Sequence, residues 1–399
     1  MSERTLLLGY DLGNCRTQLA VYDRSKIEPV LIGQTDDNPE ALYDTVISLE
    51  GEKPLVDFVD KIRRGEEIVV GDKASQAVNV LAYYFRKTLA LTRKQYPGET
   101  IQQLVVTVEG ANREFVQVIY DALQQLGIGR DRAVVLDYKQ SFQYYVLCQK
   151  KELWTNDVGL FDYHGGKLTY YQMKVDRSKM PILVGVQEKD YSDALTVSIS
   201  SDEQRAAVFE NVVYGAIHKQ LLSTLYMTGE GFAGGWADDV FRKLCVGRRL
   251  FKGSNLYVSG ACYAARELAE KQRLSDYLLL DEEMIQAHVM ISVYGEAKEQ
   301  ELILAKAGTP WYLVDEEVEL IPEGDIEVPL KVKNVLNQTE KQFMIQLEPV
   351  VAKVDKHCRI SMRIRFASPK TCIVTLKDKG FGQLFPSSNR IWEKTFDIA

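Results

Sequence analysis

The stretch GYDLGNCRT, residues 9–17, decides how the rest of this 399-residue chain is interpreted. The apolar residues 6–10 predict a buried strand that ends at Asp11 beside a glycine turn, and the alternating residues 18–22 predict the second strand of a hairpin. A carboxylate in this position can hold a hydrated magnesium ion, and the amides of the turn can bind a phosphate. Most single Asp-x-Gly turns are only turns, so this hairpin needs support from elsewhere in the chain.

A second hairpin has the same pattern of an apolar strand, an aspartate and a glycine turn. Apolar residues 158–161 lead to Asp162, then to Gly165 and Gly166, and then to an alternating strand over residues 168–173. The two glycines allow the backbone to approach a ligand closely. Two such hairpins predict an internally duplicated domain, because a nucleotide held between two hairpins needs two such loops.

The segments around the hairpins predict an α/β domain. Residues 104–149 follow a strand, helix, strand, helix order, with Asn112 as the cap of the first helix, and this order implies a partly parallel sheet. We also expect a strand at residues 47–49 and helices over residues 73–95, 202–228, 237–250 and 263–273. Residues 255–261 predict a strand that runs into a small-residue turn, where Gly260 and Ala261 could let a nucleoside lie against the backbone.

The pattern changes near residue 286. Ile360, Met362, Ile364 and Phe366 alternate with polar residues, which is typical of strands with one buried face. We predict a small antiparallel β-sandwich over residues 286–399, after an α/β domain over residues 1–285. The arginines at 359, 363 and 365 fit a solvated sheet face, with an acidic partner as the alternative.

The ordered motifs resemble those of a known superfamily. Residues 9–17, 132–145, 161–167 and 257–261 are similar, in order, to the phosphate-1, connecting, phosphate-2 and adenosine motifs of the actin and heat-shock-70 ATPases. The chain looks closest to uncharacterised bacterial heat-shock-70-like proteins. This resemblance implies an actin-like nucleotide-binding domain, which is a duplicated ribonuclease H-like fold. It also implies that the β-sandwich resembles a substrate-binding domain without its helical lid.

The resemblance also implies roles for individual residues, with ATP or ADP and Mg²⁺ as cofactors. Asp11 and Asp162 would hold magnesium through water, and Asp137 would position the attacking water. Lys87 would face the phosphates. Two sets of residues would contact the nucleotide, the phosphate-binding loops and the adenosine motif: Gly13, Asn14, Cys15, His164, Gly165 and Gly166 in the first set, Gly260 and Ala261 in the second.

Departures from the family pattern leave two main functions open. Asn14 and Cys15 stand where the chaperones have threonines, His164 replaces a glycine, and Asp137 is shorter than the family's glutamate. One hypothesis is an ATPase that couples nucleotide state to a β-sandwich that binds a protein or peptide. The alternative is a catalytically impaired scaffold. A metabolite kinase of the same superfamily is a third, weaker hypothesis, because no acidic base in a sugar pocket is evident.

Composition excludes several other classes. The net charge of −7 does not fit a nucleic-acid binder, and no apolar run approaches the ~18–20 residues that span a bilayer. No signal-peptide pattern is present, and the six cysteines form no CxxC pair, so we expect a cytoplasmic protein with reduced thiols. Residues 229–234 match GxGxxG but follow a helix-like run, which argues against a dinucleotide site. Oligomeric state is left open.

Overall fold

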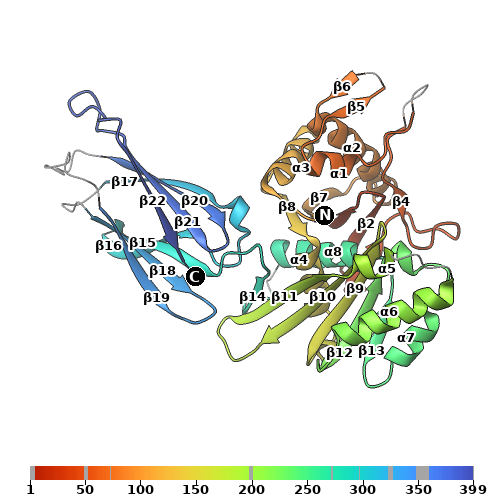
Figure 1. Ribbon diagram of the computed structural model, residues 1–399. Coiled ribbons are helices and arrows are strands. Elements are labelled where there is room, and N and C mark those ends of the chain that lie inside the picture. Colours follow the sequence, from red (N-terminus) through yellow and green to blue (C-terminus); the bar gives the residue numbers. More distant parts are fainter. Residues whose placement is uncertain are drawn as a thin grey trace. The chain divides into compact units, whose positions relative to one another are not determined.

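The protein consists of two compact units, residues 1–279 and residues 280–399, each described by itself (Figure 1). The computed structural model describes residues 5–48, 53–71, 73–196, 201–270, 273–295, 297–321, 327–346 and 359–398. The sequence places the same division at residue 285. The first unit is mixed α/β, and the second is rich in antiparallel strands.

The first unit contains a sheet built around the opening hairpin. Strand β1 pairs antiparallel with β2, and β2 pairs antiparallel with β3, while β7 lies parallel to β1 and β8 lies parallel to β7. The short strand β4 also pairs with β2. The bounds are β1 (Thr5–Leu12), β2 (Arg16–Asp23), β3 (Glu28–Leu31), β4 (Tyr43–Asp44), β7 (Thr100–Val108) and β8 (Ala133–Asp137).

A second sheet repeats this connectivity. Strand β9 pairs antiparallel with β10, β10 with β11, and β12 and β13 continue the sheet in parallel on the other side of β9. Strand β14 adds to the β11 edge. The bounds are β9 (Asp157–His164), β10 (Lys167–Asp176), β11 (Ile182–Asp190), β12 (Leu222–Thr228), β13 (Arg249–Lys252) and β14 (Tyr277–Leu280). Asp11 lies opposite Thr107, and Asp162 opposite Thr228, so the two aspartates occupy matching positions.

Eight helices accompany these sheets in the described residues. Asn112 caps α3 by accepting a hydrogen bond from the Phe115 amide, as the sequence predicts. Figure 1 shows α4 and α8 between the two sheets. The bounds are α1 (Phe58–Arg63), α2 (Ala77–Gln95), α3 (Arg113–Gln125), α4 (Tyr138–Leu147), α5 (Ser192–Thr196), α6 (Asp202–Ala216), α7 (Asp238–Leu244) and α8 (Leu256–Ala269).

The predicted strand at residues 255–261 is wrong, because α8 occupies this segment. Every residue from Leu256 to Glu267 is buried. A short, fully buried apolar run has no periodicity that separates strand from helix. The strand of this region is β13, which lies at the end of the segment predicted as helix over residues 237–250.

Three other predicted elements have different bounds. Residues 202–228 contain α6 and then β12, which is buried beside β9, so tertiary pairing overrides the helical pattern. Helix α2 begins at Ala77, because Lys73–Ser75 form β6 and pair with β5 (Ile68–Val70). At residues 47–49, Ile47 forms only an isolated bridge with Leu55, and Leu49 lies outside the described residues.

The second unit contains two antiparallel four-stranded sheets, in the orders β16-β15-β18-β19 and β17-β20-β21-β22. The alternation predicted over residues 360–366 is confirmed, since Ile360, Met362, Ile364 and Phe366 are buried in a core shared by both sheets. The bounds are β15 (Ala287–Gly295), β16 (Lys298–Ala305), β17 (Asp315–Leu320), β18 (Glu327–Asn334), β19 (Glu340–Gln346), β20 (Ile360–Ser368), β21 (Thr371–Asp378) and β22 (Ile391–Asp397).

The arginine stripe of the second unit is neutralised by neighbouring strands. Arg363 forms a two-bond ion pair with Asp315 at 2.6 and 2.7 Å. Arg359 lies 3.1 Å from Glu319, and Arg365 lies 4.0 Å from Glu393. The stripe is therefore an ion-paired sheet face.

Helices α4 and α8 cross at very close range. A Cβ added at Gly260 would lie 2.0 Å from the backbone oxygen of Ser141, and one added at Gly9 would lie 2.4 Å from the backbone oxygen of Val258. These contacts are with backbone atoms, which cannot rotate away as a flexible side chain can. Only glycine fits at both positions.

We predict that Gly260→Ala lowers the free energy of unfolding by about 1–3 kcal/mol, because the new methyl group overpacks the helix crossing. Chemical denaturation measures this change. The matched control is Gly215→Ala in α6, where nothing lies within 4 Å of an added Cβ. The control should be neutral or stabilising, because alanine is the better helix former. Equal stability of the two variants would contradict the tight crossing.

Candidate functional site

The candidate site lies where β1 and β9 end. Asp11 and Asp162 each stand near the end of the first strand of their sheet, and each is less than 10% exposed. Turns follow both residues, over residues 13–15 and at Gly165–Gly166, where both glycines have positive φ of 56° and 79°. The fold thus places two buried carboxylates and two turns at equivalent positions of two similar sheets.

A pair of tyrosines joins the two aspartates. Tyr138 begins α4 and Tyr257 lies in the first turn of α8, and their rings stack with centroids 3.8 Å apart and planes 10° apart. The Tyr138 hydroxyl donates to Asp11 Oδ1 at 2.9 Å, and the Tyr257 hydroxyl donates to Asp162 Oδ2 at 2.5 Å. Each half of the repeat therefore ends in a helix whose tyrosine holds the aspartate of its own sheet.

Burial controls the protonation of this pair. It raises the pKa of Asp11 from 3.8 to about 7, although the hydrogen bond from Tyr138 and the charge of His164 act in the opposite direction. Burial also raises the pKa of Tyr138 and of Tyr257 well above 10, so both hydroxyls keep their protons and remain donors. The site is a pair of buried aspartates, each held by a tyrosine hydroxyl.

His164 links Asp162 to a third carboxylate. Its Nδ1 forms a short hydrogen bond with Asp162 Oδ1, and its Nε2 lies 3.5 Å from Glu230 Oε2. Burial lowers the pKa of His164, but the carboxylates of Asp162, Glu230 and Asp11 raise it further, to about 9. An imidazolium therefore stands between two carboxylates at neutral pH.

Glu230 also occupies the second turn. The amide of Gly165 donates to Glu230 Oε1 at 2.6 Å. Glu230 follows Gly229, and Gly231 comes next; at both glycines an added Cβ would lie 2.3 Å from Tyr163. This GxGxxG segment follows strand β12, and not the helix-like run predicted from the sequence; its glycines serve close packing on Tyr163. This packing places the Glu230 carboxylate at the Gly165–Gly166 turn, which the resemblance assigns to phosphate binding.

The first turn keeps free donors. The Gly13 amide donates to Arg16 O at 3.1 Å, and the Thr45 hydroxyl donates to Gly13 O at 2.9 Å. The Asn14 side chain donates to Asp57 and accepts from the amide of Asp60. The amides of Asn14 and exposed Cys15 donate to no group in the described part of the chain, and the same is true of Gly166. These three amides can donate hydrogen bonds to an external anion.

A match to known families covers most of the chain. Residues 41–282 match the C-terminal profile of a family of unknown function, DUF5716. The chain belongs to this family. Residues 284–398 match a domain of unknown function, DUF8552, so the two profiles meet close to the division between the two units. No curated protein matches the chain.

In this DUF5716 protein, Asp137 acts as a helix cap. Its Oδ1 accepts from the Lys139 amide at 3.0 Å, its Oδ2 accepts from the Ala111 amide at 3.1 Å, and Gln140 completes a capping box with the Asp137 amide. Both carboxylate oxygens are thus engaged by backbone. This accounts for Asp137 without the water-positioning role that the resemblance implies.

The remaining residues predicted to contact the nucleotide do not join the cluster around Asp11 and Asp162. Lys87 is exposed on α2, and no contact in the described residues joins it to Asp11 or Asp162. Gly260 and Ala261 are buried in α8, where Gly260 packs against Ser141 of α4. Protein lies next to Gly260 on this side, and the nucleoside contact expected there stays a prediction. The turn at residues 253–255, between β13 and α8, is the strand-to-helix turn of this region.

No group of three or more His, Cys, Asp or Glu side chains in the described ranges is arranged to hold a metal directly. Asp11 Oδ2 forms no hydrogen bond there, whereas Tyr257 and His164 engage both oxygens of Asp162. Within the same ranges, no helix is long and apolar enough to cross a membrane.

The sequence analysis missed Tyr138, Tyr257 and Glu230. Two tyrosines, each in the first turn of the helix that closes one repeat, were a usable signal once the duplication was suspected. Glu230 carried no such signal, because its role depends on the packing of Gly229 and Gly231 against Tyr163.

We predict that the stability of the protein falls as pH rises from 6.5 toward 9, and that His164→Gln flattens this dependence. The folded-state pKa of His164 is raised from 6.5 to about 9, so its contribution is full below pH 6.5 and is lost as pH rises through 9. Thermal unfolding over this pH range measures the effect. His218→Gln, at an exposed histidine, is the control. Identical pH profiles for the parent and His164→Gln would contradict the ion-paired imidazolium.

Proposed function

We propose that residues 1–279 form a nucleotide-binding module of the actin and heat-shock-70 type, which binds ATP or ADP with magnesium and does not hydrolyse ATP efficiently. The observation that carries this proposal is the repeated sheet connectivity with an aspartate at the same position in each copy. Such a duplication, with a helix after the last strand of each half, is what the resemblance of the ordered motifs implies.

The first turn fits a phosphate. The free amides of Asn14 and Cys15 lie beside Asp11 in sequence, and successive amides of a turn form a concavity for anions. Asp11 would hold magnesium through water, using the oxygen that Tyr138 leaves free. When bound, magnesium would neutralise phosphate charge. The turn amides of this chain would orient the anion.

The second turn fits a phosphate only after an exchange. Glu230 accepts a hydrogen bond from the Gly165 amide and pairs with His164. Its carboxylate therefore occupies the position that a phosphate would take. A phosphate that takes this position would gain the Gly165 and Gly166 amides and the His164 cation. Glu230 therefore competes with the nucleotide for this position. Displacement of Glu230 would transmit the binding of nucleotide to the rest of the chain.

The proposal assigns no efficient hydrolysis because the water-positioning carboxylate is engaged elsewhere. Asp137 accepts hydrogen bonds from two backbone amides, and a movement of its side chain would uncap α4. A scaffold that binds no nucleotide is the second candidate, and one observation favours it. The contacts of Glu230, His164 and the tyrosine pair already engage the second turn and both aspartates within the chain.

We further propose that the β-sandwich binds a protein or peptide partner along a sheet edge. The strands β16, β19 and β22 lie at sheet edges and expose Ile303, Met344 and Ile391, which are 52%, 45% and 60% exposed. Exposed edge strands accept an extended segment through backbone hydrogen bonds.

We predict that the full chain binds ATP with a Kd near 1 μM, about −8 kcal/mol, only when magnesium is present. Asp11→Asn should abolish this magnesium-dependent binding, because it removes the carboxylate charge that would hold the hydrated magnesium ion. Glu230→Gln should tighten binding about tenfold, or about 1.4 kcal/mol, because the competing charge is lost. Titration calorimetry measures both.

The control for Glu230→Gln is Glu210→Gln, a partly buried, ion-paired carboxylate of α6 that should leave binding unchanged. Weaker binding in Glu230→Gln would contradict the competition. The absence of binding in both the parent and Glu230→Gln would select the scaffold function.

We also predict that Asp137→Asn leaves the rate of ATP turnover unchanged. Asparagine can still cap α4 through its one amide oxygen, but it loses the hydrogen bond from the Ala111 amide and cannot act as a base, so a variant that remains folded separates capping from catalysis. Phosphate release measured under saturating ATP tests this. A measurable parent rate that falls 100-fold or more in a folded Asp137→Asn variant would restore the catalytic assignment, since general bases contribute about 10²–10⁴-fold.

A further inference from the structure

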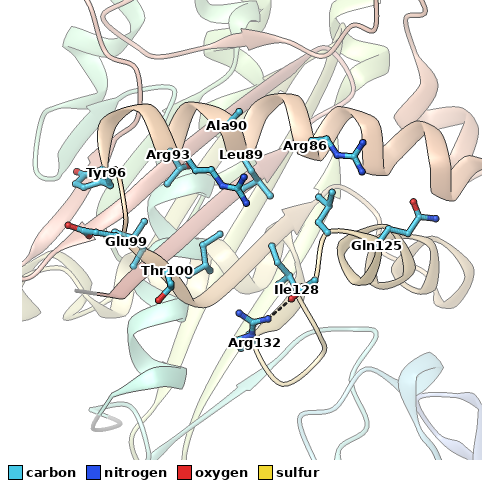
Figure 2. A pocket seen from close by; sticks show the side chains of 15 residues that line it. Arg86, Leu89, Ala90, Arg93, Tyr96, Glu99, Thr100, Gln125, Ile128 and Arg132 are labelled. Atoms are coloured by element: carbon cyan, nitrogen blue, oxygen red, sulfur yellow. Dashed lines mark hydrogen bonds between the residues drawn. The ribbon is translucent and has the colours of Figure 1, made fainter. Parts of the chain in front are cut away.

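A cavity of about 470 Å³ lies in the first unit, between α2, the start of β7 and the segment after α3 (Figure 2). Its volume falls within the range of about 300–1,000 Å³ that is usual for small-molecule sites. None of its lining residues belongs to the cluster around Asp11 and Asp162. The cavity therefore requires its own explanation.

The cavity has an apolar floor. Leu6 at the start of β1, Leu89 of α2 and Ile128 after α3 line it, and all three are less than 10% exposed. Ile101 of β7 also lines it. This floor suits the hydrocarbon part of a ligand.

Cationic side chains surround the floor. Arg86 and Arg93 lie seven residues apart on α2, two helical turns, so both share the face that carries Leu89 (Figure 2). Neither forms an ion pair in the described part of the chain. By contrast, the arginines at 16, 24 and 63 in the same half all have carboxylate partners.

Two further charges complete the rim. Arg132 lines the cavity from the segment before β8 and donates to the backbone oxygen of Gly127, as Figure 2 shows. Glu99 is the one acidic residue among those that line it. Three guanidinium groups and one carboxylate line the cavity, but Arg132 also lies 3.8 Å from the carboxylate of Asp131, so the positive charge that favours an anion comes mainly from Arg86 and Arg93.

A buried hydroxyl also lacks a partner here. Thr92 lines the cavity and is 2% exposed, and its Oγ1 has no hydrogen-bond partner. Buried polar atoms in native proteins nearly always have partners. Because Oγ1 itself is inaccessible, a ligand in the cavity would be held by the arginines and not by this hydroxyl.

We propose that this cavity is a binding site for a small amphipathic organic anion. Its carboxylate or phosphate group would pair with Arg86 and Arg93, and its hydrocarbon body would lie on Leu89 and Ile128. Guanidinium groups bind either anion through two parallel hydrogen bonds. The site does not depend on the nucleotide-binding proposal.

The test uses the full chain and the fluorescent probe 8-anilinonaphthalene-1-sulfonate, an aromatic anion. We expect saturable binding that octanoate displaces and octylamine does not. Arg93→Gln should weaken probe binding about tenfold, and the double variant Arg86→Gln/Arg93→Gln should abolish saturation. Displacement by octyl phosphate at lower concentration than octanoate would identify a phosphate ligand, and the reverse order would identify a carboxylate.

The matched control is Lys94→Gln, which removes one exposed charge from the same helix but from outside the cavity lining. It should bind the probe like the parent. Equal losses in Lys94→Gln and Arg93→Gln, or equal displacement by octylamine and octanoate, would overturn the proposal. Thermal unfolding of each variant separates a lost site from a lost fold.

Discussion

The crossing of α4 and α8 is the constraint on which the first unit depends. Gly260 lets the backbones approach until a single methyl group would collide with Ser141, and Gly9 lets α8 approach β1 in the same way. Helix α8 then packs against the first sheet through Val258 and Cys262, next to Leu7 of β1. Helix α4 packs against the second sheet, with Phe142 in the cluster that includes Leu160. Each sheet is therefore covered by the helix that closes the other half.

This exchange of helices explains the geometry of the candidate site. The crossing brings the first turns of both helices together, so Tyr138 and Tyr257 stack, and each hydroxyl reaches an aspartate. Each hydrogen bond stays within its own half of the repeat, so the stacked tyrosine pair is the contact that joins the two aspartates.

The electrostatics of the site centre on one cation. The charged His164 pairs with both Asp162 and Glu230, whose carboxylates raise the pKa of His164, while burial raises the pKa of Asp11. The same cation and the same turn amides suit a phosphate. The difference between a scaffold and a nucleotide binder therefore depends on whether a phosphate competes successfully with one glutamate side chain.

The sequence by itself determined both Asp-bearing hairpins, the cap at Asn112 and the alternating strands of the second unit. These features depend on local patterns: turn residues, capping side chains and the two-residue period of a strand with one buried face. It could not determine that residues 256–269 are helical, because a segment buried on all sides has no amphipathic pattern. Nor could it determine the partners of the predicted site residues. Tertiary structure alone decided that Asp137 caps a helix, that Gly260 faces Ser141, that Glu230 reaches the second turn, and that two arginines of α2 border a cavity. Each of these depends on contacts between segments distant in sequence, and no local pattern records such contacts.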